Sequence, residues 1–151
     1  MNNRIYFGNT IVILFSLLFF GQALPVLADS IIQIGSNPGG RIGDFVSRKQ
    51  RYEQQGALVS FSGSCDSACT LLLALPHKNT CITPDAVFRF HAPKAASART
   101  SRAALNYMMA QYPGWVRNWL SGHNGLTTRL VSMDYRYASK FMQQCNAIAA
   151  R

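Results

Sequence analysis

A serine and a histidine in this chain stand in contexts that suit acyl-transfer chemistry. Ser67 lies in a Gly-Ser-Cys-Asp-Ser-Ala-Cys-Thr segment, and His91 follows it in Phe-His-Ala-Pro. An apolar run over residues 56–61 leads into Ser67 and good helix formers over 68–75 follow it, which predicts a strand-to-helix turn. At such a turn the hydroxyl lies beside unpaired backbone N–H groups and the positive end of a helix dipole, where an oxyanion can be stabilised.

Both residues also have structural interpretations. Serine is a preferred N-cap at a strand–helix junction, and a histidine in an apolar strand such as residues 87–91 is commonly structural. A third element favours the catalytic interpretation, because the strand ending at Ile34 runs into Gly-Ser-Asn-Pro-Gly-Gly. The bare N–H groups of that glycine turn could line a pocket. Taken in order, the three elements predict a serine hydrolase that uses Ser67 as nucleophile and His91 as base.

The order and spacing of these motifs resemble the proteolytic subunit of the Clp protease, within the crotonase-like superfamily. The resemblance runs from about Ile31 to Ser139, and it is closer to secreted members in which Cys-x-Ser-Ala-Cys surrounds the serine. It implies that Ser67 is the nucleophile and His91 the general base. It also implies that a backbone N–H of the Pro-Gly-Gly turn, at Gly39 or Gly40, and the N–H of Ala68 hold the oxyanion.

The resemblance implies the fold class as well, an α/β domain with a Clp/crotonase-like ββα core and C-terminal helices. The family has a strand and a helix before its Pro-Gly-Gly strand, whereas here the leader runs almost directly into residues 31–34. We therefore expect a truncated core without the first repeat.

Asp134 is the predicted third member of a triad. In the family the aspartate precedes an aromatic-x-Ser-Ala-like segment, and residues 134–139 are similar. An imidazole base needs an acceptor on its other nitrogen, which fixes the tautomer and stabilises the imidazolium. Asp134 is the only acidic side chain between Asp85 and the C-terminus.

Residues 1–28 are typical of a cleavable secretory signal. Arg4 gives the positive start, residues 11–20 give a short apolar core, and Val-Leu-Ala before position 29 gives a cleavage site after Ala28. An uncleaved membrane anchor is the alternative, and Gln22 and Pro25 favour cleavage. The prediction is one domain, residues 29–151, in the periplasm or secreted.

Four cysteines lie in the predicted mature part: Cys65, Cys69, Cys81 and Cys145. In an oxidising compartment an even count predicts two structural disulfides, with three possible connectivities. We expect a Cys69–Cys81 bridge, which would pin the helix after Ser67 to the strand that carries His91. Cys65 and Cys69 lack a Cys-x-x-Cys partner and the histidines are scattered, so no metal site is predicted. A cysteine nucleophile is the alternative to Ser67.

The chain has a formal net charge of +9, and one stretch concentrates positive charge. Residues 86–133 contain no Asp or Glu, and their cations are Arg89, Lys94, Arg99, Arg102, Arg117 and Arg129. A positive face near His91 would attract acidic peptides, anionic lipid headgroups or cell-wall polymer. Secretion argues against nucleic acid as a partner, and a merely solvated basic surface is the alternative.

Helices are expected over residues 42–55, 95–112 and 138–149, with a short helix that carries Trp115 and Trp119 and ends at Gly122. The predicted function is a secreted serine hydrolase of peptidase type, acting on a peptide or other acyl substrate without a cofactor. The first alternative is a non-catalytic binding or assembly module that uses the basic face. The second is an acyl-thioester-binding enzyme of the crotonase type. The oligomeric state is left open.

Overall fold

A pair of parallel strands begins the sheet in the computed structural model, which describes residues 30–145. β1 (Ile31–Asn37) lies beside β2 (Leu58–Asp66), and the pairing of Ile34 with Phe61 directs both side chains into the core. Beyond that pair the register shifts by one residue, so that Asn37 pairs with Cys65. This β-bulge brings Asn37 to the same face as Cys65, close to the predicted nucleophile turn.

Four further strands complete a six-stranded sheet. β3 (Thr80–Ile82) and β4 (Val87–Phe90) run parallel to successive stretches of β2. β5 (Val131–Asp134) pairs antiparallel with β4, and β6 (Gln143–Gln144) pairs parallel with β3.

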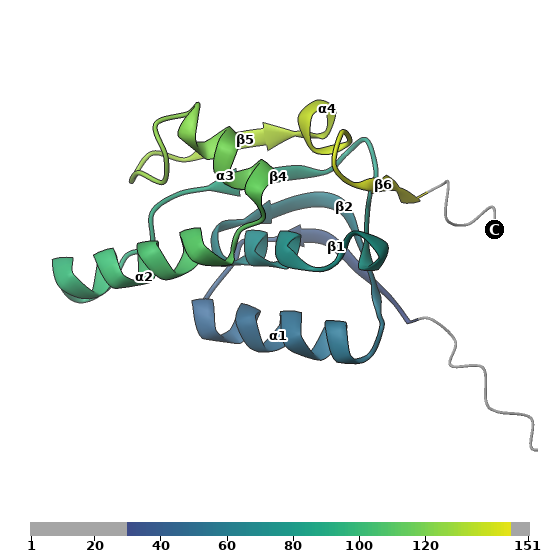
Figure 1. Cartoon of the computed structure of the whole chain (residues 1–151), viewed down its shortest axis with the longest axis horizontal. Coiled ribbons are helices and arrows are strands. Elements are labelled where there is room, and N and C mark those ends of the chain that lie inside the picture. The colour runs from purple at the N-terminus through teal and green to yellow at the C-terminus, as the bar shows by residue number, and fades with distance from the viewer. Residues whose placement is uncertain (1–29, 146–151) are drawn as a thin grey trace, which may run out of the picture.

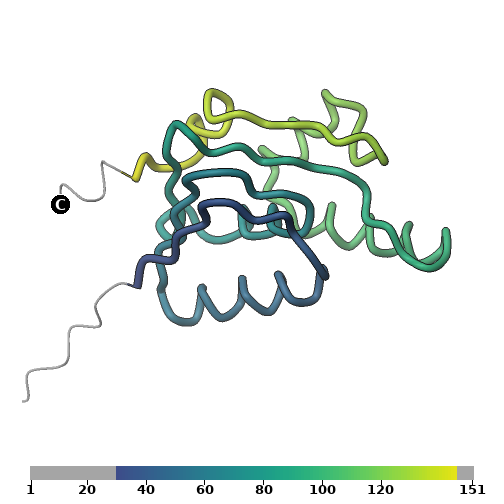
Figure 2. Tube along the Cα trace, turned by 180° about the vertical axis from the view of Figure 1, so that it is seen from behind, coloured from purple at the N-terminus to yellow at the C-terminus, as the bar shows by residue number. Residues whose placement is uncertain are grey.

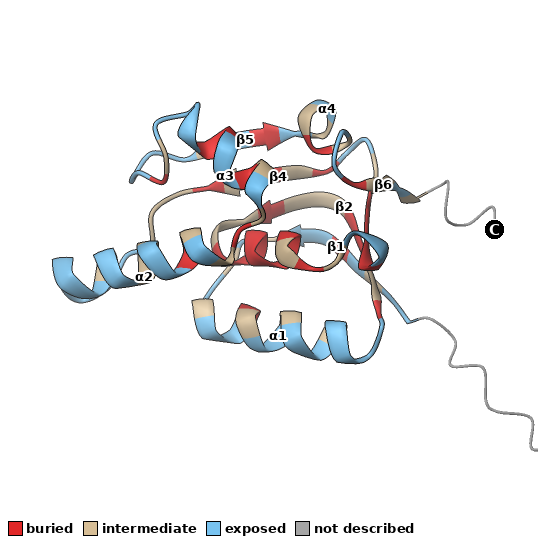
Figure 3. Ribbon diagram, in the orientation of Figure 1, coloured by how far each residue is buried: buried red, intermediate tan, exposed pale blue. Residues whose placement is uncertain are grey.

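The helices lie on one face of this sheet, as Figure 1 shows. Their bounds are α1 (Ile42–Gln54), the 3-10 helices η1 (Ser67–Ala74) and η2 (His77–Asn79), α2 (Ala98–Gln111), α3 (Gly114–Ser121) and the short α4 (Tyr135–Ala138). Side chains of the sheet pack against η1, which is almost entirely buried (Figure 3). Seen from behind in Figure 2, the other face of the strands is in view. It carries hydroxyl and amide groups, with Gln33 Nε2 donating to Ser62 Oγ at 3.1 Å.

Parallel strands end at a common edge, and this arrangement sets the location of the site. β1 ends before the Pro-Gly-Gly turn, β2 ends before Ser67, and β4 ends before His91. All three segments therefore emerge together at the carboxyl edge of the sheet, where ligands of open α/β sheets commonly bind.

The helices predicted over residues 42–55 and 95–112, and the short one that ends at Gly122, are confirmed within a few residues at their ends, and the last predicted helix is wrong. A helix over 138–149 was expected, but α4 ends at Ala138 and residues 143–144 pair with β3 as a strand. Pairing with β3, together with the disulfide at Cys145, outweighs the helical periodicity of this segment. Residues 146–149 of the predicted helix lie outside the described residues, as does the predicted signal of residues 1–28.

The cysteines form two disulfides, Cys65–Cys69 and Cys81–Cys145. The expectation of two bridges is confirmed, and the Cys69–Cys81 pairing is wrong. Cys69 belongs to η1 and is buried in the core, whereas Cys81 alternates with the core residue Ile82 and belongs to the opposite face of β3. The sheet itself therefore separates Cys69 from Cys81.

The search for membrane-spanning segments covered only the described residues. No helix there combines the length and apolar character needed to cross a bilayer.

Candidate active site

Ser67 occupies a left-handed backbone conformation at the junction of β2 and η1. Its φ is 54°, one of two positive values among the non-glycine residues that the structure describes. Such a conformation costs a non-glycine residue roughly 1–2 kcal/mol, so the surrounding contacts must hold it in place. The predicted strand-to-helix turn at Ser67 is confirmed.

The Pro-Gly-Gly turn packs directly on this junction. Gly39 has φ +85°, and a Cβ added there would lie 2.4 Å from the carbonyl oxygen of Asp66 and 3.2 Å from the amide nitrogen of Ala68. Only glycine can occupy this position without a shift of the backbone. The turn and the N–H of Ala68 thus lie against one another, as the predicted oxyanion site requires.

A side-chain bond within the turn distinguishes the two candidate glycine donors. Gly39 donates its N–H to Asn37 Oδ1 at 2.9 Å, in an Asx-type turn. Gly40, with φ +157°, makes no backbone hydrogen bond to the residues that the structure describes. The Gly40 N–H is therefore the one available to a ligand.

A buried pair of hydroxyls supports the other side of the junction. Thr70 Oγ1 donates to the carbonyl oxygen of Ser67 at 2.6 Å, and Tyr112 Oη lies 2.6 Å from the same Thr70 oxygen. Since the Thr70 proton is used on Ser67, Tyr112 donates to Thr70. Burial raises the pKa of Tyr112 and keeps this donor protonated. Tyr112 at the end of α2 thereby fixes the backbone of Ser67.

His91 follows the last residue of β4 and is half-buried. Its Nδ1 lies 2.8 Å from the carbonyl oxygen of Ala92, while the Ala92 N–H donates to the carbonyl of Thr127 at 2.6 Å. A carbonyl can only accept, so the neutral imidazole carries its proton on Nδ1 and has a free electron pair on Nε2. That is the tautomer a general base needs.

One cavity of about 560 Å³ joins the two side chains to the glycine turn. Its walls are formed by residues from the carboxyl edge of the sheet and from α2: Gly40, Arg41, Ile42, Ser67, His91, Pro93, Lys94, Ala95, Ala104 and Met108. The structure thus brings Ser67, His91 and Gly40 to the same space.

Asp134 does not lie at this cavity. It pairs with Val87 across the β4–β5 ladder, four residues before His91, which places it about 13 Å along the strand from the histidine. Its Oδ1 accepts the N–H of Tyr137 at 3.1 Å and caps α4. The predicted pairing of Asp134 with His91 is therefore not formed, and His91 Nδ1 contacts the Ala92 carbonyl instead.

Asp66, next to Ser67, is also directed elsewhere. Its Oδ1 lies 3.4 Å from Arg89 Nε. The oxygen is buried and has no hydrogen bond to the described residues, so the contact is an ion pair without hydrogen-bond geometry.

Two cavity residues, Arg41 and Lys94, are site candidates that the sequence did not single out as site residues. Their nearness to Gly40 and His91 in the sequence was the available signal. Among residues 30–145, no group of three or more His, Cys, Asp or Glu side chains is arranged to hold a metal ion.

Comparison with solved structures identifies similar folds. A mutant of ClpP1 from Listeria monocytogenes superposes with a TM-score of 0.54, covering 81% of this chain and 79% of that chain. The chain has a ClpP-like fold. Sequence identity is 15%, so the likeness concerns the fold alone. Protein-family models give no match, and sequence comparison with curated proteins gives none either.

Proposed function

We propose that this protein is a serine hydrolase of peptidase type, with Ser67 as nucleophile and His91 as general base. The observation that carries the proposal is the shared cavity: a serine in a strained strand-to-helix turn, a histidine in the base tautomer and a free glycine N–H all line it. The ClpP-like fold is consistent with a peptidase, although many chemistries occur on one fold.

The proposed reaction uses these groups in sequence. His91 Nε2 takes the proton of Ser67 Oγ as the oxygen attacks a substrate carbonyl carbon. The N–H groups of Gly40 and Ala68 donate to the oxyanion that forms. His91 returns the proton to the leaving amine. Water, deprotonated by the same nitrogen, then attacks the acyl carbon, and His91 passes that proton to Ser67 Oγ as the bond between Ser67 and the acyl group breaks. The Ala92 carbonyl orients the imidazole but carries no charge to stabilise the imidazolium, so we expect slower turnover than a triad with a carboxylate.

Location outside the cytoplasm belongs to the same proposal. Two disulfides and the leader-like residues 1–28 support a periplasmic or secreted protein. A peptide or another acyl compound is the proposed substrate, and the reaction needs no cofactor.

Fluorophosphonate labelling of the purified, disulfide-intact protein tests the proposal. We expect covalent modification at Ser67, identified by mass spectrometry. Ser67→Ala should abolish labelling, and His91→Ala should reduce it nearly as far, because the hydroxyl is a poor nucleophile without its base. Ser62→Ala is the matched control: it removes a hydroxyl from β2, the strand that leads into Ser67, but outside the cavity, and it should label at the wild-type rate.

Absence of labelling in folded wild-type protein would contradict the hydrolase. Salt-sensitive binding of an anionic partner in that case would favour the non-catalytic module with a basic face.

A further inference from the structure

The cavity that holds Ser67 and His91 is lined by positively charged side chains and by no acidic ones. Arg41 and Lys94 line it, and no Asp or Glu is among its ten lining residues. Ile42, Ala104 and Met108 supply apolar surface in the same cavity. A ligand in this space would meet apolar surface and two positive charges, one beside the glycine turn and one beside the histidine.

Neither cation is paired with an acidic side chain among residues 30–145. Within the described part of the chain, ion pairs join Lys49 to Glu53 and Arg89 to Asp66, and none involves Arg41 or Lys94. Both side chains are exposed and line the cavity, where they can bind an incoming anion.

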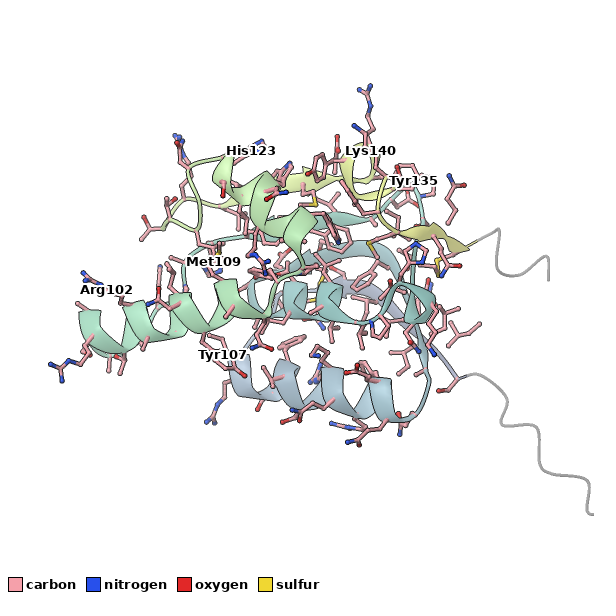
Figure 4. The ribbon with its side chains drawn as sticks, viewed as in Figure 1. Arg102, Tyr107, Met109, His123, Tyr135 and Lys140 are labelled. Carbon is pink, nitrogen blue, oxygen red and sulfur yellow. A yellow bond between two sulfur atoms is a disulfide. The ribbon has the colours of Figure 1, made fainter. Side chains whose placement is uncertain are left out.

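The positive surface extends from the cavity along α2. A neighbouring cavity of about 570 Å³ shares Lys94 with the first and adds Arg102, and a third of about 480 Å³ is lined by Arg99 and Arg102. Arg102 lies on the outer part of α2, away from the sheet (Figure 4). The first turn of α2 contains no acidic residue, although a helix N-terminus favours negative charge. Arg99 and Arg102 therefore add positive charge at the N-terminal end of α2, which is already positive because of the helix dipole, and no acidic residue of the first turn offsets that charge.

From this arrangement we infer that the site selects acidic peptides, with Arg41 and Lys94 as specificity-determining residues that bind Glu or Asp side chains flanking the reacting bond. The inference rests on the proposed function, because it names the substrate class of the same site. A peptide fits the space better than a lipid, since Arg41 and Lys94 come from the separate segments that follow β1 and β4, and the positive charge continues from Lys94 to Arg102 through the neighbouring cavities, as charged side chains do along an extended chain.

Two phosphonate probes that react with an activated serine measure this selectivity. Acetyl-Glu-Glu-Ala diphenyl phosphonate and its Gln-Gln-Ala counterpart differ only in charge. We expect the Glu probe to label Ser67 about tenfold faster, equivalent to about 1.4 kcal/mol. The Arg41→Gln/Lys94→Gln double variant should lower that ratio to about twofold or less. Raising the salt from about 0.05 to about 0.5 M should lower the wild-type ratio as well.

The matched control is Lys78→Gln/Arg136→Gln, which removes the same charge from exposed positions that do not line the three cavities. It should keep the wild-type ratio. Equal labelling rates of the wild-type protein by the two probes would overturn the inference. An equal fall in the ratio of the Glu to the Gln labelling rate in the cavity double variant and in the control double variant would overturn it as well.

Calorimetry on the Ser67→Ala protein separates this inference from the proposed function. Tighter binding of acetyl-Glu-Glu-Ala amide than of the Gln peptide would support acidic selectivity even if fluorophosphonate failed to label the wild type. Fluorophosphonate labelling with no preference between the peptides would leave the hydrolase intact and overturn the substrate class. Binding to phosphatidylglycerol vesicles without discrimination between the peptides would also overturn it, in favour of a lipid surface.

Discussion

Replacing Gly39 by Ala tests how the glycine turn and the nucleophile turn are held together. The new Cβ would lie 2.4 Å from the Asp66 carbonyl oxygen and 2.9 Å from the Ser67 Cβ. Both neighbours belong to the turn that carries the proposed nucleophile, so relief of the clash must displace either the Pro-Gly-Gly turn or Ser67 itself.

Two costs contribute to the expected loss of stability. Alanine at positive φ costs roughly 1–2 kcal/mol, and forcing a methyl group into close-packed backbone adds about 1–3 kcal/mol. We therefore expect the free energy of unfolding to fall by about 2–5 kcal/mol and the Tm to fall by about 8–20 °C. A displacement of about 1 Å at the oxyanion site should also slow fluorophosphonate labelling about a hundredfold.

Gly56→Ala is the matched control. Gly56 also has positive φ, +63°, but an added Cβ would meet nothing within 4 Å. This variant carries the conformational cost alone, roughly 1–2 kcal/mol, and should label normally. Urea unfolding and labelling of both variants, measured where each is folded, give the comparison. Equal losses of stability in the two variants would refute the packing of Gly39 on the Ser67 turn.

Two further predictions concern stability. Burial raises the pKa of Tyr112, so the contribution of Tyr112 to stability is present below about pH 10 and is lost as the pH rises above that value. Tyr112→Phe should therefore flatten the alkaline decline in the free energy of unfolding measured with urea. An unchanged slope of that decline would show that Tyr112 ionises as freely in the folded protein as in the unfolded chain. The Cys81–Cys145 bridge spans 64 residues and the Cys65–Cys69 bridge spans 4. Double Cys→Ala removal should therefore cost about 4 kcal/mol for the first bridge and about 2 kcal/mol for the second in urea unfolding, and a larger loss at the short loop would contradict the loop-closure argument.

The local features of the site were predictable from the sequence. A strand followed by good helix formers places Ser67 at a turn, and Pro-Gly-Gly after a strand makes a turn with positive φ, because backbone propensities act over a few residues. The order of three parallel strands then brings both turns and His91 to one edge of the sheet. The ClpP-like fold was likewise predictable, since it depends on that order.

Contacts between distant segments were decided by the tertiary structure alone. Residue spacing predicted Asp134 as the partner of His91, but the register of β4 with β5 places it opposite Val87. The Ala92 carbonyl that contacts His91 instead is a backbone group, which leaves no trace in the residue types. The cysteine pairing depended on which face of the sheet each side chain occupies, and the expected Cys69–Cys81 bridge would have had to cross it. Arg41 and Lys94 meet at one cavity for the same reason: the sheet, and not the sequence interval, sets the distance between the segments that follow β1 and β4.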